Sequence, residues 1–336
     1  MHCTVASVVI PTLAADSALR DCLRSLEAQT FQDFDIVVVD NSGRGAVRQL
    51  GIPSARVRII ENSSNAGFGT AVNQGWQSSE SPWIATLNDD AEAEPAWLEK
   101  MIAAAKQDPE IGLVACQVRL SESELDSAGM LISSDGSSKQ RGHGQLPSAF
   151  PREEEILMPT GSAALYRREM LEDIGGFADA FFLYCEDTDL GLRAARRGWR
   201  CRYVPTAIVR HSYSRTAGRA SALKALLVER NRLYLIIRNF PLRMLWKAPF
   251  ASTLRYVWHV LYMFRGRGKA AEFAKAGGNG AALPMLVLKA HWQAMKHAAT
   301  LLQERREIRS RTYLSDVQFE RLMAKYSISV REVAAL

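Results

Sequence analysis

Cysteine is scarce in this chain, and the cysteines present form no recognisable framework. There are five among 336 residues, an odd number, and none belongs to a Cys-x-x-Cys pair. Structural zinc sites and disulfide-rich folds depend on paired, closely spaced cysteines. We exclude both classes and expect a reducing compartment. The N-terminal stretch MHCTVASVVIPT has no positively charged segment before its apolar run, so we expect no secretory signal peptide.

Long apolar runs and glycine-rich nucleotide loops are also missing. No predominantly apolar run of about 18 residues or more predicts a membrane-spanning helix. The first apolar strand is followed by IPTLAADS, which has neither the Gly-x-Gly-x-x-Gly pattern of dinucleotide-binding enzymes nor a Walker phosphate loop. The segments GRGAVR and GFGTAV each lack the third glycine. These absences disfavour an enzyme that uses a nicotinamide cofactor.

Charge is distributed unevenly, although the net charge of the chain is only +6. Residues 1–212 contain 20 Lys and Arg against 29 Asp and Glu, whereas residues 213–336 contain 22 against 7. The hydrophobic content of 47% is enough for a packed core. We therefore expect two parts with separate roles: an acidic domain over 1–215 and a basic, mostly helical region over 216–336.

The acidic part alternates apolar strands with amphipathic helices. The segments ASVVIPT, DFDIVVVD, PWIATL and IGLVACQV predict strands, and apolar spacing predicts helices at 16–30 and 66–79. This alternation predicts an α/β fold with a mainly parallel sheet flanked by helices. Ligands bind at the carboxyl ends of such strands. We expect the segments that follow predicted strands to gather at that edge: residues 11–12, 40–42, 88–90 and 160–162.

Two of these segments are acidic and have alternative explanations. Asp40 is either a turn-forming residue or an acceptor for a nucleotide base or ribose hydroxyl. Asn88, Asp89 and Asp90 end a predicted strand, where consecutive carboxylates suit a hard divalent ion. Acids also favour helix starts, and a helix is expected to open near Pro95. Residues alone do not decide between these alternatives.

A further acidic cluster lies beside the aromatic run FFLY. Glu186, Asp187 and Asp189 stand at the start of a predicted helix whose last turn is rich in arginine, and the helix dipole accounts for Asp189. It does not account for Glu186 and Asp187, and a carboxylate in such a place suits a general base. His211 follows the predicted strand CRYVPTAIVR and is either structural or a ligand of the same ion.

Taken in order, these segments resemble the family-2 inverting glycosyltransferases of the GT-A (Rossmann-like) fold, and more narrowly their bacterial rhamnosyltransferase-like branch. The matching pieces are SVVIPT, VVVDNSG, NAGFGTAVNQG, LNDDAEAEPAWLE and the long segment from GSAALY to IVRH. They run in family order over about residues 6–212, and the order and spacing carry the resemblance. The C-terminal helical extension resembles the family only loosely.

The resemblance implies roles for the matching residues. Seven are expected to line the pocket for the nucleotide of the donor sugar: Pro11, Thr12, Asp40, Asn65, Gly67, Asn88 and Asp89. A divalent metal ion, Mn²⁺ or Mg²⁺, is expected to bind Asp90 and His211. Many relatives have an acid where this chain has Asn88, which can bind a hydroxyl but is a weaker metal ligand. Three residues are expected to shape the donor and acceptor cleft: Gly161, Ser162 and Tyr184.

The implied reaction transfers a rhamnose-like or other hexose from a nucleoside-diphosphate sugar to a hydroxyl of a glycolipid or polysaccharide acceptor. Asp187 is expected to accept the proton of that hydroxyl, and the anomeric centre inverts. Glu186 is expected to raise the proton affinity of Asp187, because two close carboxylates resist double ionisation. The loop-like, Ser- and Gly-rich segment 120–155 is expected to help select the acceptor.

The basic C-terminal region suggests a partner of its own. Residues 239–269 interleave aromatic side chains with Lys and Arg, among them Trp246, Phe250, Tyr256, Trp258, Tyr262 and Phe264. Arg255 and His259 argue against a spanning helix and favour one that lies on an anionic membrane, which predicts a cytoplasmic protein attached peripherally to the cytoplasmic face of the inner membrane. The alternative is packing on the catalytic domain or a homo-oligomer contact. No motif supports nucleic-acid binding.

Two other functions are consistent with parts of the sequence. A nucleotidyltransferase that makes a sugar nucleotide would need a glycine-rich loop with Lys or Arg after the first strand, and IPTLAADS has none. A catalytically inactive module that binds sugar nucleotides would have no need of Asp90, Asp187 and His211. The transferase is therefore the favoured interpretation.

Overall fold

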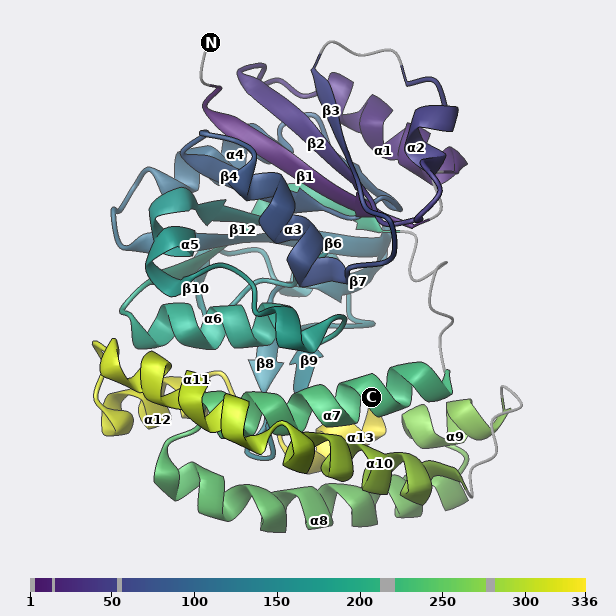
Figure 1. The fold of residues 1–336 in the computed structure, drawn as a ribbon, viewed down its shortest axis with the longest axis vertical. Helices are drawn as coiled ribbons and strands as arrows, with labels where there is room; N and C mark the ends of the chain where they lie inside the picture. Colours follow the sequence, from purple (N-terminus) through teal and green to yellow (C-terminus); the bar gives the residue numbers. More distant parts are fainter. Residues whose placement is uncertain (1–3, 14–15, 53–55, 212–220, 276–281) are drawn as a thin grey trace. The chain divides into compact units, whose positions relative to one another are not determined.

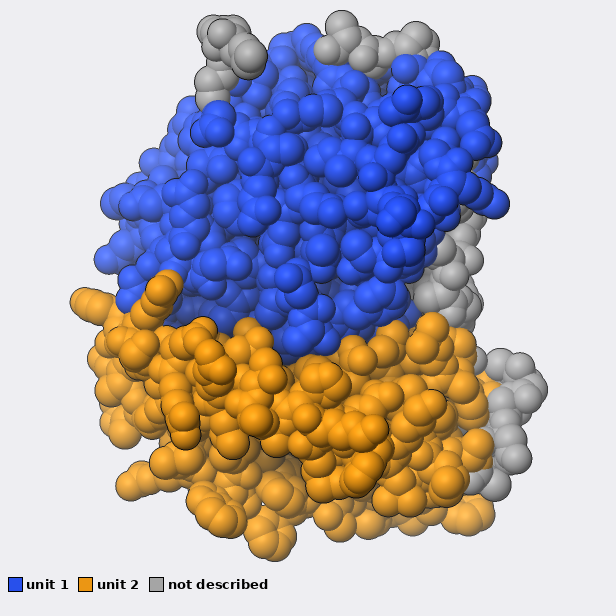
Figure 2. All heavy atoms as spheres, viewed as in Figure 1, with its two compact units in different colours: residues 1–130, 140–216 blue, residues 131–139, 217–336 orange. Residues whose placement is uncertain are grey.

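The computed structural model describes residues 4–13, 16–52, 56–211, 221–275 and 282–336. The chain divides into two compact units, which Figure 2 shows in different colours. Residues 1–130 and 140–216 form the first unit, and residues 131–139 and 217–336 form the second. The sequence did not suggest that residues 131–139 belong with the C-terminal helices.

The first unit is built on a sheet with the strand order β10-β12-β6-β11-β4-β1-β2-β3 (Figure 1). Its strands are β1 (Ala6–Thr12), β2 (Phe34–Asp40), β3 (Val57–Glu61), β4 (Trp83–Leu87), β6 (Ile111–Ser121), β10 (Glu154–Ile156), β11 (Ala163–Arg167) and β12 (Arg200–His211). β1 is parallel to β2 and β4, β2 to β3, and β6 to β12, whereas β11 runs antiparallel between β4 and β6. The expected α/β fold with a mainly parallel sheet is confirmed.

Helices cover both faces of this sheet. α1 (Ser17–Glu27), α2 (Ala46–Gln49) and α4 (Trp97–Ala105) pack on one face, and α3 (Phe68–Gln77), α5 (Arg168–Ile174) and α6 (Glu186–Arg196) pack on the other. Side chains alternate along each strand, so Val8 and Ile10 join the core under the first group and Val9 joins the core under the second. Both faces are buried, which explains the continuous apolar runs in the sequence.

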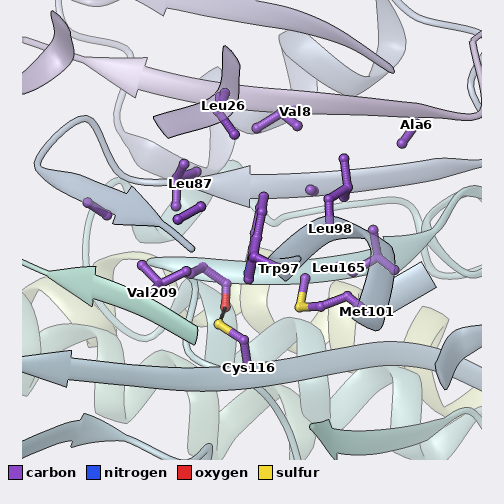
Figure 3. Packing of buried hydrophobic residues seen from close by; sticks show 14 of the residues in the cluster. Ala6, Val8, Leu26, Leu87, Trp97, Leu98, Met101, Cys116, Leu165 and Val209 are labelled. Carbon is purple, nitrogen blue, oxygen red and sulfur yellow. Dashed lines mark hydrogen bonds between the residues drawn. The ribbon is translucent and has the colours of Figure 1, made fainter. Parts of the chain in front are cut away.

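The core beneath α4 fixes the central strands. Trp97 and Met101 of α4 lie among the buried side chains that include Leu165 of β11 and Cys116 of β6 (Figure 3). The Cys116 thiol donates to the carbonyl of Ala163 over 3.4 Å. Because β6 and β11 are held here, the loops at their ends are held too.

The expectation of a loop over 120–155 is only partly right. This segment contains β7 (Glu124–Ser127), β8 (Met130–Ile132), β9 (Ser138–Gln140), the 3₁₀ helix η1 (Pro147–Ala149) and β10. β7 pairs antiparallel with β6, and β8 and β9 form a separate two-stranded sheet. These strands have only three or four residues each, too few to show an apolar alternation, so the sequence pattern does not reveal them.

The second unit is mostly helical. Its helices are α7 (Ala222–Asn239), α8 (Leu242–Phe264), α9 (Gly268–Lys275), α10 (Leu283–Lys296), α11 (Ala298–Ser310), α12 (Asp316–Lys325) and α13 (Val330–Ala335). α8, α10 and α11 all pack against α7. Ile132 forms a parallel bridge with Ser327. Within the described ranges, no helix combines the length and the apolar character needed to cross a bilayer.

Candidate functional site

The predicted site residues lie at one edge of the sheet, where β1, β2 and β4 end. These strands are parallel, so their carboxyl ends share that edge. Gly161 and Ser162 were expected to follow a strand, but they precede β11. They still reach the same edge because β11 runs antiparallel to β4. The N–H of Asn88 donates to the carbonyl of Ser162 over 2.8 Å.

His211 lies between two carboxylates at this edge. The antiparallel pairing of β12 with β5 (Ala91–Ala93) sets His211 opposite Ala91. Its Nε2 is 3.1 Å from Oδ1 of Asp90 and its Nδ1 is 3.0 Å from Oδ2 of Asp126. Burial disfavours the charged ring, but the two carboxylates outweigh burial and raise the pKa of His211 to about 9. The amide of Asn88 lies 3.3 Å from Nε2.

Asp126 is a site residue that the sequence did not reveal. It is buried in β7, and Nδ1 of His143 lies 3.2 Å from its Oδ1. Burial acts to raise the pKa of Asp126, but hydrogen bonds with His143 and His211 hold it below its ordinary value. Asp126 thereby orients the ring that faces Asp90. Nothing in a stretch rich in Ser and Glu distinguishes it from neighbouring acids.

Asp90 and His211 suit two ligands of a divalent ion. A carboxylate oxygen and an imidazole nitrogen converge to 3.1 Å. The carboxylate of Asp126 on the other ring nitrogen is the outer partner that metal-binding histidines commonly have. No group of three or more His, Cys, Asp or Glu residues within the described part of the chain is arranged to hold an ion. Among these described residues, Asp90 and His211 therefore form a pair of candidate ligands.

Asp89 and Thr12 connect the ends of β4 and β1. The Thr12 hydroxyl donates to Oδ2 of Asp89 over 2.5 Å. Burial raises the pKa of Asp89 to about 6, and the charge of Asp90 adds to the effect although the Thr12 hydrogen bond opposes it. Two adjacent carboxylates with limited access to water favour a cation or a hydroxyl group as a neighbour.

Both carboxylate oxygens of Asp40 accept hydrogen bonds from backbone N–H groups. One of its oxygens accepts the N–H of Ser42 over 2.8 Å, and the other accepts the N–H of Val47 over 2.9 Å. Burial acts to raise the pKa of Asp40, but hydrogen bonds with the Ser42 side chain and with these two N–H groups lower it. The contacts are those of the turn-forming alternative that the sequence left open.

Asn65 and Gly67 lie just before α3, and Gly67 is its N-cap residue. Oδ1 of Asn65 accepts the N–H of Gly67 over 2.9 Å, and the N–H of Phe68 donates to the carbonyl of Phe182 over 2.8 Å. Gly67 has a φ of +87°, and a Cβ there would lie 2.3 Å from that carbonyl oxygen. The amide of Asn41 donates to the Gly67 carbonyl over 3.3 Å. Only glycine permits this close approach of α3 to the chain that precedes α6.

The chain that precedes α6 has an unusual backbone. Phe182, Tyr184 and Cys185 have φ values of 62°, 71° and 68°. Non-glycine residues rarely adopt this region, at about 1–3 kcal/mol each. Such strain persists only where surrounding contacts require it, and here it aims the first turn of α6. The partly buried Tyr184, predicted to line the cleft, lies in this segment before α6.

Glu186 and Asp187 begin α6. Oδ2 of Asp187 accepts the N–H of Gly161 over 3.1 Å, and Oδ1 accepts the N–H of Thr188 over 2.6 Å. Burial nevertheless raises the pKa of Asp187. Burial and the charge of Asp187 raise the pKa of Glu186 to about 8. Within the described residues, Oε2 of Glu186 is buried without a hydrogen-bond partner.

Asp189 has the structural role expected of it. Nε of Arg193 donates to Oδ2 of Asp189 over 2.7 Å, and both side chains are buried. The Asp187 carboxylate instead accepts the N–H of Gly161. The next residue is Ser162, whose carbonyl accepts the N–H of Asn88. The two acidic clusters therefore meet through the segment before β11.

Comparison with known proteins identifies relatives of the chain. The model of the family "Glycosyl transferase family 2" matches residues 7–175. The N-acetylglucosaminyl-diphospho-decaprenol L-rhamnosyltransferase of Mycobacterium tuberculosis is 28% identical over 280 residues, which cover 75% of this chain and 89% of that protein. The O-antigen biosynthesis protein RfbC of Myxococcus xanthus is 28% identical over 228 residues, 63% of this chain and 17% of its own.

A solved structure shares the fold. GalNAc-T7, crystallised with UDP, GalNAc and Mn²⁺, is similar with a TM-score of 0.60 at 14% identity. The similarity covers 76% of this chain and 51% of GalNAc-T7, so the chain spans about half of that protein's length. At this identity the likeness concerns the arrangement of helices and strands, which is that of the GT-A fold.

Proposed function

Because this chain belongs to glycosyl transferase family 2 and is thus a glycosyltransferase, we propose that it transfers a hexose, such as rhamnose, with inversion from a nucleoside-diphosphate sugar to a hydroxyl group. The observation that carries the proposal is the carboxylate of Asp187. It is fixed by Gly161 and has a raised pKa at the sheet edge that also holds Asp90 and His211.

Asp187 is the proposed general base. Its hydrogen bonds to the N–H groups of Gly161 and Thr188 fix the plane of the carboxylate. Burial makes it a stronger base than an ordinary aspartate. It accepts the proton of the acceptor hydroxyl while that oxygen attacks the anomeric carbon, on the face opposite the departing nucleoside diphosphate. A single displacement inverts the anomeric centre and needs no covalent enzyme intermediate.

Glu186 is the proposed partner of that base. With a pKa of about 8 it is mainly protonated at neutral pH, so the pair carries one negative charge. That charge resides on Asp187, because its carboxylate accepts two N–H groups while Oε2 of Glu186 has no described partner. In this proposal a protonated Glu186 leaves Asp187 ionised and ready to accept a proton, instead of raising the proton affinity of Asp187 as the sequence led us to expect.

Asp90 and His211 are the proposed ligands of Mn²⁺ or Mg²⁺. When bound, such an ion supplies positive charge that offsets the charge of the departing diphosphate. Asp126 holds the His211 ring in the orientation that presents Nε2 to the Asp90 carboxylate. Nε2 must be unprotonated to bind a metal, so the raised pKa of His211 makes the affinity depend on pH.

The remaining residues are proposed to bind the two substrates. The nucleotide is proposed to lie against Pro11, Thr12, Asp40, Asn65, Gly67, Asn88 and Asp89. Asp40 contributes chiefly through the turn that it holds, since both of its oxygens already accept backbone N–H groups. The donor and acceptor sugars are proposed to lie between Gly161, Ser162 and Tyr184.

The proposed acceptor is a lipid-linked glycan or a polysaccharide. The similar protein of M. tuberculosis is named for a decaprenol-linked acceptor, and the Myxococcus protein for O-antigen synthesis. A lipid-linked acceptor would bring the reaction to a bilayer surface, which we propose is the cytoplasmic face of the inner membrane.

The test compares Asp187→Asn with the wild type. Donor binding is measured by thermal shift with UDP-, dTDP- and GDP-sugars with and without Mn²⁺, and turnover by release of the nucleoside diphosphate. We expect Asp187→Asn to keep donor binding and to lose about 10²–10⁴-fold in turnover. Asp21→Asn, on the exposed side of α1, is the matched control. Near-wild-type turnover of Asp187→Asn would exclude it as the base, and no stabilisation by any sugar nucleotide would refute the donor class.

A further inference from the structure

One face of α8 is apolar and open to solvent. Three aromatic side chains on it are 77%, 79% and 81% exposed: Trp246, Phe250 and Phe264. Four aliphatic side chains are exposed beside them: Leu242, Leu254, Val257 and Leu261. These seven residues, the apolar stripe of α8, recur every three or four positions and so lie on one face along the whole helix.

The opposite face of α8 is polar, and it is the buried one. Arg255 and Ser252 are both buried. Nε of Arg255 donates to Oδ2 of Asp135 over 2.5 Å, and Nη2 donates to Oε2 of Glu229 over 2.7 Å. The hydroxyl of Ser252 accepts from Nη1 of Arg232 over 2.9 Å. α8 therefore has the reverse of the usual arrangement, with charge inside and aromatic groups outside.

The buried network holds α8 in this orientation. Asp135 and Arg232 are 0% and 1% exposed, and Arg232 also pairs with Glu229. The Tyr256 hydroxyl donates to Glu229 over 2.5 Å. Two carboxylates and two guanidinium groups thus neutralise one another. Rotation of α8 to bury its aromatic side chains would withdraw Arg255 from both carboxylates, which explains why the apolar stripe stays outside.

The charged residues of α8 beside the apolar stripe, and those just after the end of the helix, are all basic. α8 contains no acidic residue, and Arg243 and Lys247 are exposed on its first turns. Arg265 and Arg267 are exposed just after its end. Exposed aromatic groups with bases at both ends of the same helix match a surface that offers hydrocarbon and negative charge together.

We propose that the apolar stripe of α8 binds the surface of an anionic lipid bilayer. At 1.5 Å per residue the helix is about 34 Å long and lies in the plane of the headgroups. Its aromatic side chains enter the interface, and the bases at its two ends contact lipid phosphates. A second copy of the chain suits this face less well, because a symmetric contact would bring the same bases together without acids to pair them.

The inference goes beyond the proposed reaction, since it concerns a surface of the second unit. It is tested with the full chain and without any sugar nucleotide, so its failure is distinguishable from failure of the transferase proposal. Co-flotation is measured with two kinds of vesicle. The neutral vesicles contain phosphatidylcholine alone, and in the anionic vesicles about 30% of the lipid is phosphatidylglycerol. We expect binding to the anionic vesicles and little binding to the neutral ones.

The variants separate the contribution of the aromatic groups from that of charge. Trp246→Ala/Phe250→Ala/Phe264→Ala is expected to lower anionic-vesicle binding at least about tenfold. Arg243→Gln/Lys247→Gln is expected to lower it about 30-fold, or about fivefold for each base.

Tyr313→Ala is the matched control, because Tyr313 is 79% exposed and lies outside α8. Its binding is expected to equal that of the wild type. The inference is overturned if the wild type does not bind anionic vesicles or if the triple variant binds them equally well. It is also overturned if light scattering shows a dimer that the triple variant dissociates while vesicle binding is absent.

Discussion

Arg255 neutralises two buried carboxylates, and its removal leads to a quantitative prediction. Arg255→Met keeps most of the apolar volume but leaves Asp135 and Glu229 with Arg232 alone. One buried negative charge then has no partner, at a cost of about 3–5 kcal/mol in the free energy of unfolding. With a urea dependence of about 2 kcal/mol per molar, the unfolding midpoint is expected to fall by about 2 M.

The assay is urea unfolding followed by far-ultraviolet circular dichroism at about 222 nm. The helices of the second unit dominate the signal at this wavelength. Arg309→Met is the control, since it removes the same group from a partly exposed pair with Asp316 at 2.9 Å. An exposed pair contributes about 1 kcal/mol or less. If Arg255→Met cost no more than Arg309→Met, the network would not be what holds α8.

A double variant and a pH comparison sharpen this prediction. Asp135→Asn/Arg255→Met restores neutrality and is expected to recover a large part of the lost stability. Burial acts to raise the pKa of Glu229, but Arg232 and Arg255 outweigh it and hold that pKa well below its ordinary range. Stability from a lowered carboxyl pKa is present above the unfolded pKa and is lost in acid. The difference between wild type and Arg255→Met is therefore expected to hold from pH 7 to about 4.5 and to shrink as the pH falls further.

Two further predictions concern the sheet edge. Asp126→Asn is expected to lower the apparent affinity for Mn²⁺ about 10–100-fold through the ring of His211, measured from the Mn²⁺ dependence of turnover; an unchanged dependence would contradict the orienting role. The folded pKa of Glu186, about 8, lies above its unfolded value, so the native state holds an extra proton and stability falls as pH rises from about 4.5 toward 8. Glu186→Gln is expected to flatten that fall in urea unfolding, and an unchanged slope would assign it to another group.

Local sequence pattern predicted the parts of the fold that depend on burial. β1, β2, β4 and β6 are continuous apolar runs because both faces of the sheet are covered. β3 and the short strands between 120 and 155 were not predicted, because each is too short or too mixed in polarity to show the apolar run or alternation that indicates a strand. The direction of β11 was not predictable either, because the pairing of a strand is decided by partners distant in sequence.

In the candidate site, too, local pattern predicted some residues, whereas others depend on partners distant in sequence. Asp90, Asp187 and His211 stand out in the sequence because polar residues end apolar elements there, and the structure brings Asp90 and His211 into contact. Asp126 was not predicted as a site residue because its role depends on a histidine 85 residues away. In the second unit, the aromatic content of α8 was visible, but which of its faces is buried depends on Asp135 in a different part of the chain.

The position of Asp135 also affects the order of events on the ribosome. Asp135 lies 97 residues before Arg232 and 120 before Arg255, so at about 5–20 residues per second it is synthesised about 5–24 s before its two partners. During that interval its carboxylate must remain hydrated, because burial of an unpaired charge is strongly unfavourable. Residues 131–139 are therefore expected to stay exposed to solvent while the flanking segments of the first unit can already fold. They are expected to reach their final position only after α8 has been synthesised.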